Sequence, residues 1–207
     1  MPAEVLWTFF AASVVLAVAP GPDNIFVLVQ SALHGRQSGV FVTMGLCTGL
    51  IVHTTAAAIG VASILKVSTL AFTILKIIGA AYLLFLSWQS FRASVTSIDY
   101  KETKCLNRFQ MYRRGVFMNI TNPKVAIFFL AFLPQFVNSS YGAVLPQFFI
   151  LGGLFIAATA LVFGTVAFLA GIIGNVLYRS PRSQKIMNCI AGTVLAALAI
   201  KLATVRS

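Results

Sequence analysis

Long apolar runs separated by short polar segments are the dominant pattern of this chain. A helix that crosses a bilayer needs about 20 apolar residues. Six runs are long enough to do so, and they cover residues 5–33, 39–65, 69–91, 115–137, 143–177 and 186–205. The pattern therefore predicts an all-α integral membrane protein, with six transmembrane helices that form a single transmembrane domain over residues 1–207.

Two of these runs are interrupted by proline. In the first run, Pro20 and Pro22 flank Gly21. Proline removes a backbone donor and clashes with the preceding helical turn, and glycine loosens the chain further. The fourth run is interrupted at Asn122-Pro123-Lys124. We therefore expect a broken helix at each place, with Asp23 and Lys124 directly after the prolines.

The two halves of the chain share one order of segments. Each half has a broken span, then a glycine-rich span, then a shorter span, and residues 76–81 align with residues 189–194. Because each half has three spans, the halves would enter the membrane from opposite sides. This predicts two inverted repeats, about 1–92 and about 113–207, with the substrate site near their interface. The alternative is a chance match between two helices rich in Leu and Ala.

Composition and charge support a membrane location. The chain is 59% hydrophobic and 9% charged, with a mean hydropathy of +0.93, whereas soluble domains carry about 25% charged residues. The net charge of +11 would suit nucleic acid in a soluble protein. Here we attribute it to cytoplasmic loops, which retain Lys and Arg, and we expect no nucleic-acid partner. The basic loop at about 92–114 is then cytoplasmic, and six spans place both termini outside.

Asp23 is the first candidate for a functional side chain. A carboxylate inside a membrane span is costly and is therefore a functional candidate by default. One interpretation is structural: Asp23 caps the second half-helix by accepting its free amides. The other is that Asp23, with Asn24 beside it, lies in a polar cavity and binds a substrate ammonium group or a coupling proton.

Lys124 holds the corresponding position after the second break. Asn119, Thr121 and Asn122 can satisfy the backbone groups that Pro123 frees. Lys124 could form an ion pair with Asp23 that makes both charges tolerable, or it could attract a substrate carboxylate. In a transporter, the substrate or a proton could also open such a pair.

Three further residues inside the spans carry groups of interest. Histidine is the side chain best suited to relay protons near neutral pH, so His53 is a candidate relay, although a lone histidine in an apolar helix is more often a hydrogen-bonded core residue. Tyr82 could line a cavity or bond to a neighbouring helix. Lys76 lies near the outer end of its span, so we expect its ammonium group to extend to that surface. In the second run, Gly45-x-x-x-Gly49 allows another helix to approach closely, so we expect a close helix crossing there.

Several classes of function lack their signatures. The chain has no glycine-rich phosphate loop, so no ATP drives it directly. It has no HExxH, paired-carboxylate or nucleophile-elbow pattern, so we expect no enzyme and no cofactor. Its three cysteines are scattered and give no support to a metal site or a disulfide framework.

Four segments, one from each of the first four runs, together resemble a known family. They are Ala19-Pro20-Gly21-Pro22-Asp23, Gly45 to His53, Gly79-Ala80-Ala81-Tyr82-Leu83, and Asn122-Pro123-Lys124 with residues 128–136. The chain resembles the LysE/RhtB-type amino-acid exporters of bacteria (the LysE superfamily) over nearly its whole length. The resemblance implies a six-span carrier of the inner membrane that expels amino acids or related small metabolites, powered by the proton gradient.

The sequence therefore predicts a secondary active exporter that works by proton antiport. Access would alternate around the breaks at Pro20–Asp23 and Asn122–Lys124. Its partners would be a small amino-acid-like substrate, protons and the lipid bilayer, and the sequence leaves homo-oligomer formation open. One alternative is a carrier of a metal cation or a drug, but a divalent-cation site would need several carboxylates. The other is a membrane redox enzyme or scaffold, for which paired cysteines near the breaks would be expected.

Overall fold

The computed structural model describes residues 1–19, 21–61, 69–93, 106–179 and 181–204, and this part of the chain is helical throughout apart from its turns. The α-helices are α1 (Ala3–Val18), α2 (Pro22–His34), α3 (Arg36–Ala56), α5 (Thr69–Arg92), α6 (Arg108–Ile120), α7 (Pro123–Ile127), α8 (Val144–Arg179) and α9 (Pro181–Thr204). The shorter turns are the π-helical η1 (Ala57–Val61) and η3 (Phe128–Phe132) and the 3₁₀ turns η4 (Leu133–Phe136) and η5 (Ser139–Tyr141). Most of the predicted cytoplasmic loop, at positions 94–105, lies outside the described residues.

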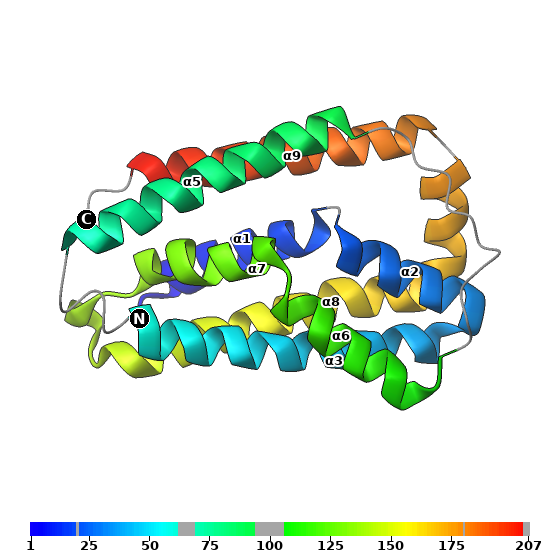
Figure 1. Ribbon diagram of the computed structural model, residues 1–207, viewed down its shortest axis with the longest axis horizontal. Coiled ribbons are helices and arrows are strands. Elements are labelled where there is room, and N and C mark those ends of the chain that lie inside the picture. The colour runs from blue at the N-terminus through cyan, green and yellow to red at the C-terminus, as the bar shows by residue number, and fades with distance from the viewer. Residues whose placement is uncertain (20, 62–68, 94–105, 180, 205–207) are drawn as a thin grey trace.

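Four helices in the described part are long and apolar enough to cross a membrane, namely α3, α5, α8 and α9. Two bent pairs, α1 with α2 and α6 with the α7–η4 segment, raise the number of spans to six if each pair is one span. The axes bend by 64° in the first pair and by 49° in the second. The described ends of the chain lie at the same end of the molecule, as any even number of crossings requires (Figure 1). The described part of the chain therefore has four to six candidate spans, and helices are interrupted at both predicted breaks.

The helices pack in two groups. α3 lies against both α6 and α8, while α5 and α9 run side by side as a separate pair (Figure 1). The α5–α9 pair is joined by a hydrogen bond of 2.7 Å that the Ser87 hydroxyl donates to the Gly192 carbonyl. In a bilayer, such contacts and close packing replace the hydrophobic effect as the source of helix association.

The close helix crossing predicted at Gly45 is confirmed. A Cβ atom added to Gly45 would overlap the Tyr112 carbonyl oxygen, and one added to Gly115 would overlap the Val42 carbonyl oxygen. The backbones of α3 and α6 are therefore in direct contact. One turn further along α3, a Cβ on Gly49 would lie 2.7 Å from the Asn119 side chain. This crossing holds the end of α6, and with it the second break, against α3.

A cluster of phenylalanines packs the first broken span against the second. The Phe9 ring of α1 lies 5.7 Å from Phe128 and 5.2 Å from Phe136, measured between ring centroids. Phe128 in turn lies 5.1 Å from Phe155 of α8. These rings are buried, and offset or edge-on aromatic pairs add stability beyond the area that they bury. The rings come from α1, from the η3–η4 segment that follows the second break, and from α8. The cluster includes no residue of either break, and the break residues make polar contacts instead.

Two details differ from the predictions. α6 begins at Arg108, inside the stretch expected to be a loop, because Asn107 and Gln110 form a capping box. In this motif each side chain accepts from the other residue's backbone amide, which removes two orphan donors at the start of a helix. The second difference is Lys76, which is buried at 7% exposure rather than extended to the surface.

Candidate functional site

The first break separates α1 from α2 and leaves the end of α1 with free carbonyl groups. α1 ends at Val18, and α2 begins at Pro22 with Gly21 as its N-cap residue. Pro22 is well placed there, because the first residue of a helix needs no backbone donor. Pro20 lies outside the described residues. The last carbonyls of any helix have no partner within the helix, and they carry the negative end of its dipole.

Two side chains satisfy these carbonyls at the end of α1. The Lys124 ammonium, which comes from the second break, donates to the Leu16 and Ala19 carbonyl oxygens at 3.1 and 2.9 Å. The Asn24 amide donates to the Ala17 carbonyl oxygen at 2.8 Å. A cation at a helix C-terminus is stabilised by the dipole as well as by its hydrogen bonds. Lys124 therefore caps α1 from a position more than 100 residues further along the chain.

Asp23 faces the second break rather than its own helix. Its side chain is 3% exposed, and its Oδ2 accepts a hydrogen bond of 2.7 Å from the Asn122 amide nitrogen. The N-terminus of α2 has no side-chain cap, so the interpretation of Asp23 as an N-cap is wrong. The other carboxylate oxygen, Oδ1, is buried without a hydrogen-bond partner among the described residues. Asp23 therefore keeps one acceptor atom available inside the protein.

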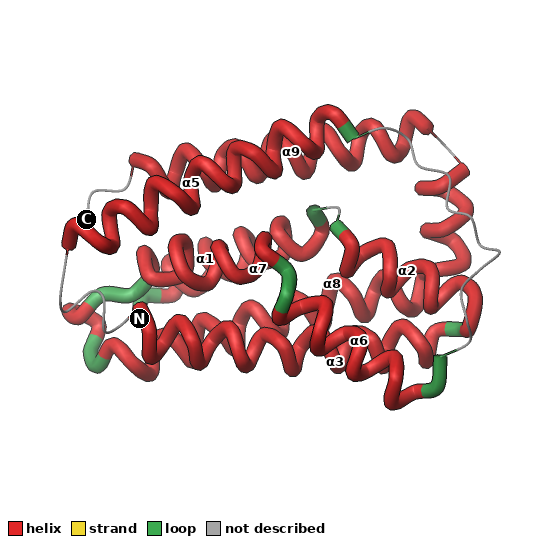
Figure 2. The backbone as a smooth tube through the Cα atoms, in the orientation of Figure 1, coloured by secondary structure: helices red, strands yellow, loops and turns green. Residues whose placement is uncertain are grey.

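The second break is built by Asn122. α6 ends at Ile120, and α7 begins at Pro123 with Asn122 as its N-cap. The Asn122 side-chain oxygen accepts from the Lys124 backbone amide at 3.0 Å, while its nitrogen donates to Asp23. One side chain thus starts the second half-helix and connects it to the first break. Figure 2 shows the second break as a short loop segment between α6 and α7.

The two breaks are therefore in direct contact, but the contact is not the ion pair between Asp23 and Lys124 considered above. Within the described contacts, Asp23 bonds to Asn122, and Lys124 bonds to backbone carbonyls. Because a backbone carbonyl is the same in every residue type, sequence reasoning missed Leu16 and Ala19 as the partners of Lys124. The available signal was the proline break itself, because the last carbonyls of a helix lack partners within it.

His53 lies beside the second break. Its Nε2 is 3.0 Å from the Asn119 carbonyl oxygen, and since a carbonyl only accepts, Nε2 must carry the proton and donate. The imidazole is buried, with its centroid 5.7 Å from that of Phe129. This geometry is that of the hydrogen-bonded core residue weighed above. It nevertheless places a titratable group within one hydrogen bond of the break.

Tyr82 is not brought to the breaks by any described hydrogen bond. It lies half-buried on α5, with its ring 6.1 Å from that of Phe85.

Two polar residues outside the break contacts are more deeply buried than Tyr82, namely Gln30 at 1% and Thr159 at 2% exposure. The Gln30 Oε1 and Thr159 Oγ1 atoms have no described hydrogen-bond partner. Thr159 escaped sequence reasoning, and its only signal was a hydroxyl in a long apolar run.

The arrangement offers an acceptor to a cationic group and a donor to an anionic group. Asp23 Oδ1 can receive a hydrogen bond from an ammonium group or bind a proton. The Lys124 ammonium can exchange its backbone carbonyl partners for an anionic group. Both changes would alter the contacts that hold the two broken spans together.

Comparison with known proteins supports the family resemblance. A homoserine/homoserine lactone efflux protein of Salmonella typhimurium is 32% identical over 206 residues, which cover 100% of this chain and 99% of the relative. An uncharacterized membrane protein of Vibrio cholerae is 30% identical over 207 residues, with 100% of both chains covered. A leucine efflux protein of Salmonella typhimurium is 26% identical over 202 residues, which cover 97% of this chain and 95% of the relative.

No solved structure is a significant match to this chain. The family match is broad, because residues 14–206 match the LysE type translocator family and so include both breaks. The relatives' names and the apolar helices also agree with a multi-pass membrane protein. The chain therefore belongs to the family of LysE type translocators.

Proposed function

We propose that this protein is a secondary active exporter of amino acids or related small metabolites, driven by proton antiport across the bacterial inner membrane. The observation that carries the proposal is the contact between the two breaks. Asn122 bonds to Asp23 at 2.7 Å, and the Lys124 ammonium bonds to two carbonyls at the end of α1. A carboxylate and an ammonium group are thus held within the spans where a zwitterionic substrate could replace their present partners.

The names of the relatives help to assign the two charges. Homoserine, its lactone and leucine all carry an α-amino group, whereas the lactone has no free carboxylate. The group common to all three is therefore cationic when protonated. This favours Asp23 as the residue that meets the substrate ammonium or the exchanged proton, with Lys124 adding a contact to a carboxylate where the substrate has one.

The transport step follows from the same contacts. The Lys124 ammonium has three N–H donors and uses two of them on the Leu16 and Ala19 carbonyls. A substrate carboxylate that draws the ammonium away from these carbonyls would remove the hydrogen bonds that connect α1 to the second break. A substrate ammonium or a proton on Asp23 weakens the carboxylate's bond to Asn122. Binding thus loosens the connection between the broken spans, and we propose that access alternates by movement of one half against the other.

The packing of the helices supports two inverted repeats. α3 of the first half packs on α6 of the second, and α8 of the second half packs on α1 and α2 of the first. These are equivalent pairs when the halves are exchanged. α5 and α9, the third spans of the two halves, pack on each other. We further propose that both termini are periplasmic, since the basic positions cluster at the opposite ends of the spans.

The remaining predicted residues have supporting roles in this proposal. Asn24 holds the end of α1 through the Ala17 carbonyl. His53 holds the Asn119 carbonyl, and as a titratable group it is the candidate for passing protons to the site. Tyr82 would contribute a hydroxyl from α5 only in a conformation that brings α5 toward the breaks.

The proposal is tested by transport of radiolabelled leucine and homoserine into inverted membrane vesicles or proteoliposomes with an imposed pH gradient. We expect uptake that a protonophore abolishes. Asp23→Asn and Lys124→Met should each lower the initial rate at least tenfold, because each removes the charge that a substrate would meet.

Two variants that make the same chemical changes outside the breaks serve as controls. Glu4→Gln removes an exposed carboxylate at the start of α1, and Lys201→Met removes an exposed ammonium group on α9. Both should transport at rates close to those of the unaltered protein. If Asp23→Asn and Lys124→Met transport as well as these controls, the site assignment is wrong. If no amino acid is moved by the unaltered protein, the proposed substrate class is wrong.

A further inference from the structure

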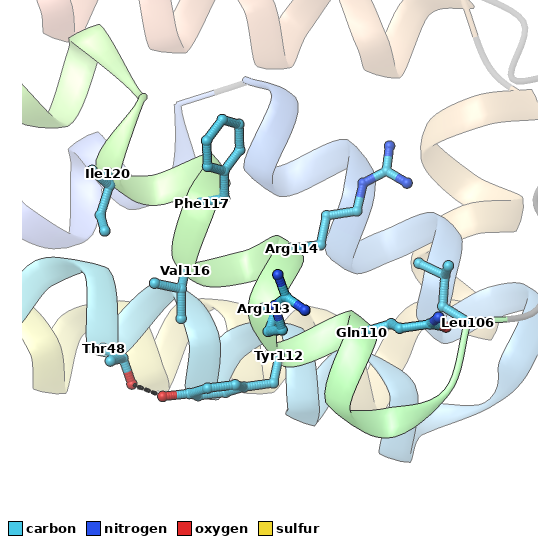
Figure 3. A pocket seen from close by; sticks show the side chains of 9 residues that line it. All are labelled: Thr48, Leu106, Gln110, Tyr112, Arg113, Arg114, Val116, Phe117 and Ile120. Atoms are coloured by element: carbon cyan, nitrogen blue, oxygen red, sulfur yellow. Dashed lines mark hydrogen bonds between the residues drawn. The ribbon is translucent and has the colours of Figure 1, made fainter.

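A pocket on the surface of α6 is separate from the break contacts. It has a volume of about 640 Å³ and is shown in Figure 3. Its lining residues are Thr48, Leu106, Gln110, Tyr112, Arg113, Arg114, Val116, Phe117 and Ile120. All but Thr48 and Leu106 belong to α6. Thr48 accepts a hydrogen bond of 3.1 Å from the Tyr112 hydroxyl, which joins the pocket wall to α3.

The pocket combines two cations with an apolar surface in a definite order. Arg113 and Arg114 lie in the second turn of α6, with Phe117 and Ile120 one and two turns further along the helix. Phe117 is 68% exposed and Ile120 is 39% exposed. At 1.5 Å per residue, the distance along the helix from Arg113 to Ile120 is about 10 Å. In the orientation proposed above, on which this inference rests, the cationic end lies at the cytoplasmic surface and the apolar end points into the span.

The two guanidinium groups have donors to offer. Arg114 lies over the Phe26 ring at 4.7 Å, and Arg113 lies over the Phe109 ring at 5.7 Å. Stacking on a ring face positions a guanidinium group while leaving its N–H groups at the edge. Neither group donates a described hydrogen bond, and the two acidic residues in the described part, Glu4 and Asp23, lie in other places.

We propose that this pocket binds an anionic phospholipid of the cytoplasmic leaflet. Its phosphate would accept hydrogen bonds from Arg113 and Arg114, since the planar N–H fork of a guanidinium group matches phosphate oxygens well. Part of one acyl chain would lie along Val116, Phe117 and Ile120. Basic pockets at the cytoplasmic ends of transmembrane helices bind lipid headgroups in this way.

Charge also decides against a second copy of the chain as the occupant. The chain has 15 Lys and Arg residues against 4 Asp and Glu, with a net charge of +11. A second copy would bring a predominantly basic surface to two arginines, and like charges in an interface oppose association. An anionic lipid supplies the opposite charge and an apolar chain in the order that the pocket presents them.

The test is native mass spectrometry of the full-length protein, released from detergent with phosphatidylglycerol or phosphatidylethanolamine of identical acyl chains. We expect preferential retention of phosphatidylglycerol. Arg113→Gln with Arg114→Gln should weaken its apparent affinity about thirtyfold, at about fivefold for each cation lost near a membrane surface. Arg113→Lys with Arg114→Lys should retain most of the binding, because lysine also binds phosphate as a point charge.

A matched double variant controls for charge alone. Arg36→Gln with Arg92→Gln also removes two cations, each of which lies over an aromatic ring outside the pocket. Its affinity for phosphatidylglycerol should be unchanged. An equal loss in both double variants would overturn the proposal, because binding would then follow net charge.

Two further results would also overturn it. One is competition by inorganic phosphate at the same concentration as the lipid, which would indicate a free-phosphate site. The other is a protein dimer, present without lipid, that the Arg113 and Arg114 variants dissociate.

Phe117→Ser tests the apolar part of the pocket separately from the two arginines. It should weaken the binding of long-chain phosphatidylglycerol but not the binding of a short-chain analogue. Circular dichroism and size-exclusion elution confirm folding, and if the glutamine pair misfolds, the lysine pair and phosphate competition on the unaltered protein decide.

Discussion

Asn122 is the residue whose replacement tests the connection between the two breaks most directly. Its side chain makes two hydrogen bonds, one that caps α7 at the Lys124 amide and one that donates to the Asp23 carboxylate. Losing an N-cap costs about 1 kcal/mol. Losing a hydrogen bond to a charged group costs about 1.5–3 kcal/mol in soluble proteins, and bonds between membrane helices average nearer 0.6 kcal/mol. Asn122→Ala should therefore lower the free energy of unfolding by about 1.5–4 kcal/mol.

Substitutions at Asn122 can separate the two bonds. Asn122→Ser keeps an oxygen that can cap α7 but cannot reach Asp23, so we expect it to lose only the second contribution. Asn122→Asp also keeps the cap, but it places a second carboxylate oxygen against Asp23, where the present separation is 2.7 Å. Because like charges at this distance repel strongly, Asn122→Asp should be less stable than Asn122→Ser.

The measurement is unfolding of the purified protein in mixed micelles with increasing SDS, followed by far-ultraviolet circular dichroism. Asn138→Ala is the matched control, because Asn138 also caps a short helical turn, accepting from the Ser140 amide at 2.9 Å, but is exposed. It should cost about 0.5–1 kcal/mol. If Asn122→Ala costs no more than Asn138→Ala, the contact between the breaks does not contribute to stability and the reasoning fails.

Two other substitutions test the elements that support the site. Gly45→Leu should prevent α3 from packing on α6, because a Cβ atom at Gly45 already overlaps the α6 backbone beside Gly115. Gly153→Leu is the control and should fold normally, because no atom lies within 4 Å of a Cβ atom added there. The yield of monodisperse protein distinguishes the two variants. His53→Gln, which keeps an N–H donor for the Asn119 carbonyl, should retain more proton-driven transport than His53→Leu. An equally complete loss in both would show that the imidazole relays protons rather than holding the break.

The sequence by itself determined the spans, the breaks and the family. Each depends on local properties: twenty or so apolar residues cross a bilayer, and proline cannot continue a helix wherever the rest of the chain lies. The start of α6 was also readable, because Asn107 and Gln110 have capping-box spacing, but the charged residues that follow favoured a loop. The glycine spacing at Gly45 correctly predicted a close crossing without saying which helix would be crossed.

Only the tertiary structure decided which groups meet at the breaks. Sequence reasoning considered Asp23 and Lys124 as a pair because they are opposite charges in an apolar environment. In the folded chain Asp23 bonds to Asn122, and Lys124 bonds to the Leu16 and Ala19 carbonyls. Hydrogen-bond partners about 100 residues apart in the sequence meet only because of the way in which the spans cross. Here the contact of α3 with α6 sets the position of the second break. A buried ammonium group then takes whichever acceptors lie within reach, and at the end of a broken helix these are backbone carbonyls that no side-chain pattern can reveal.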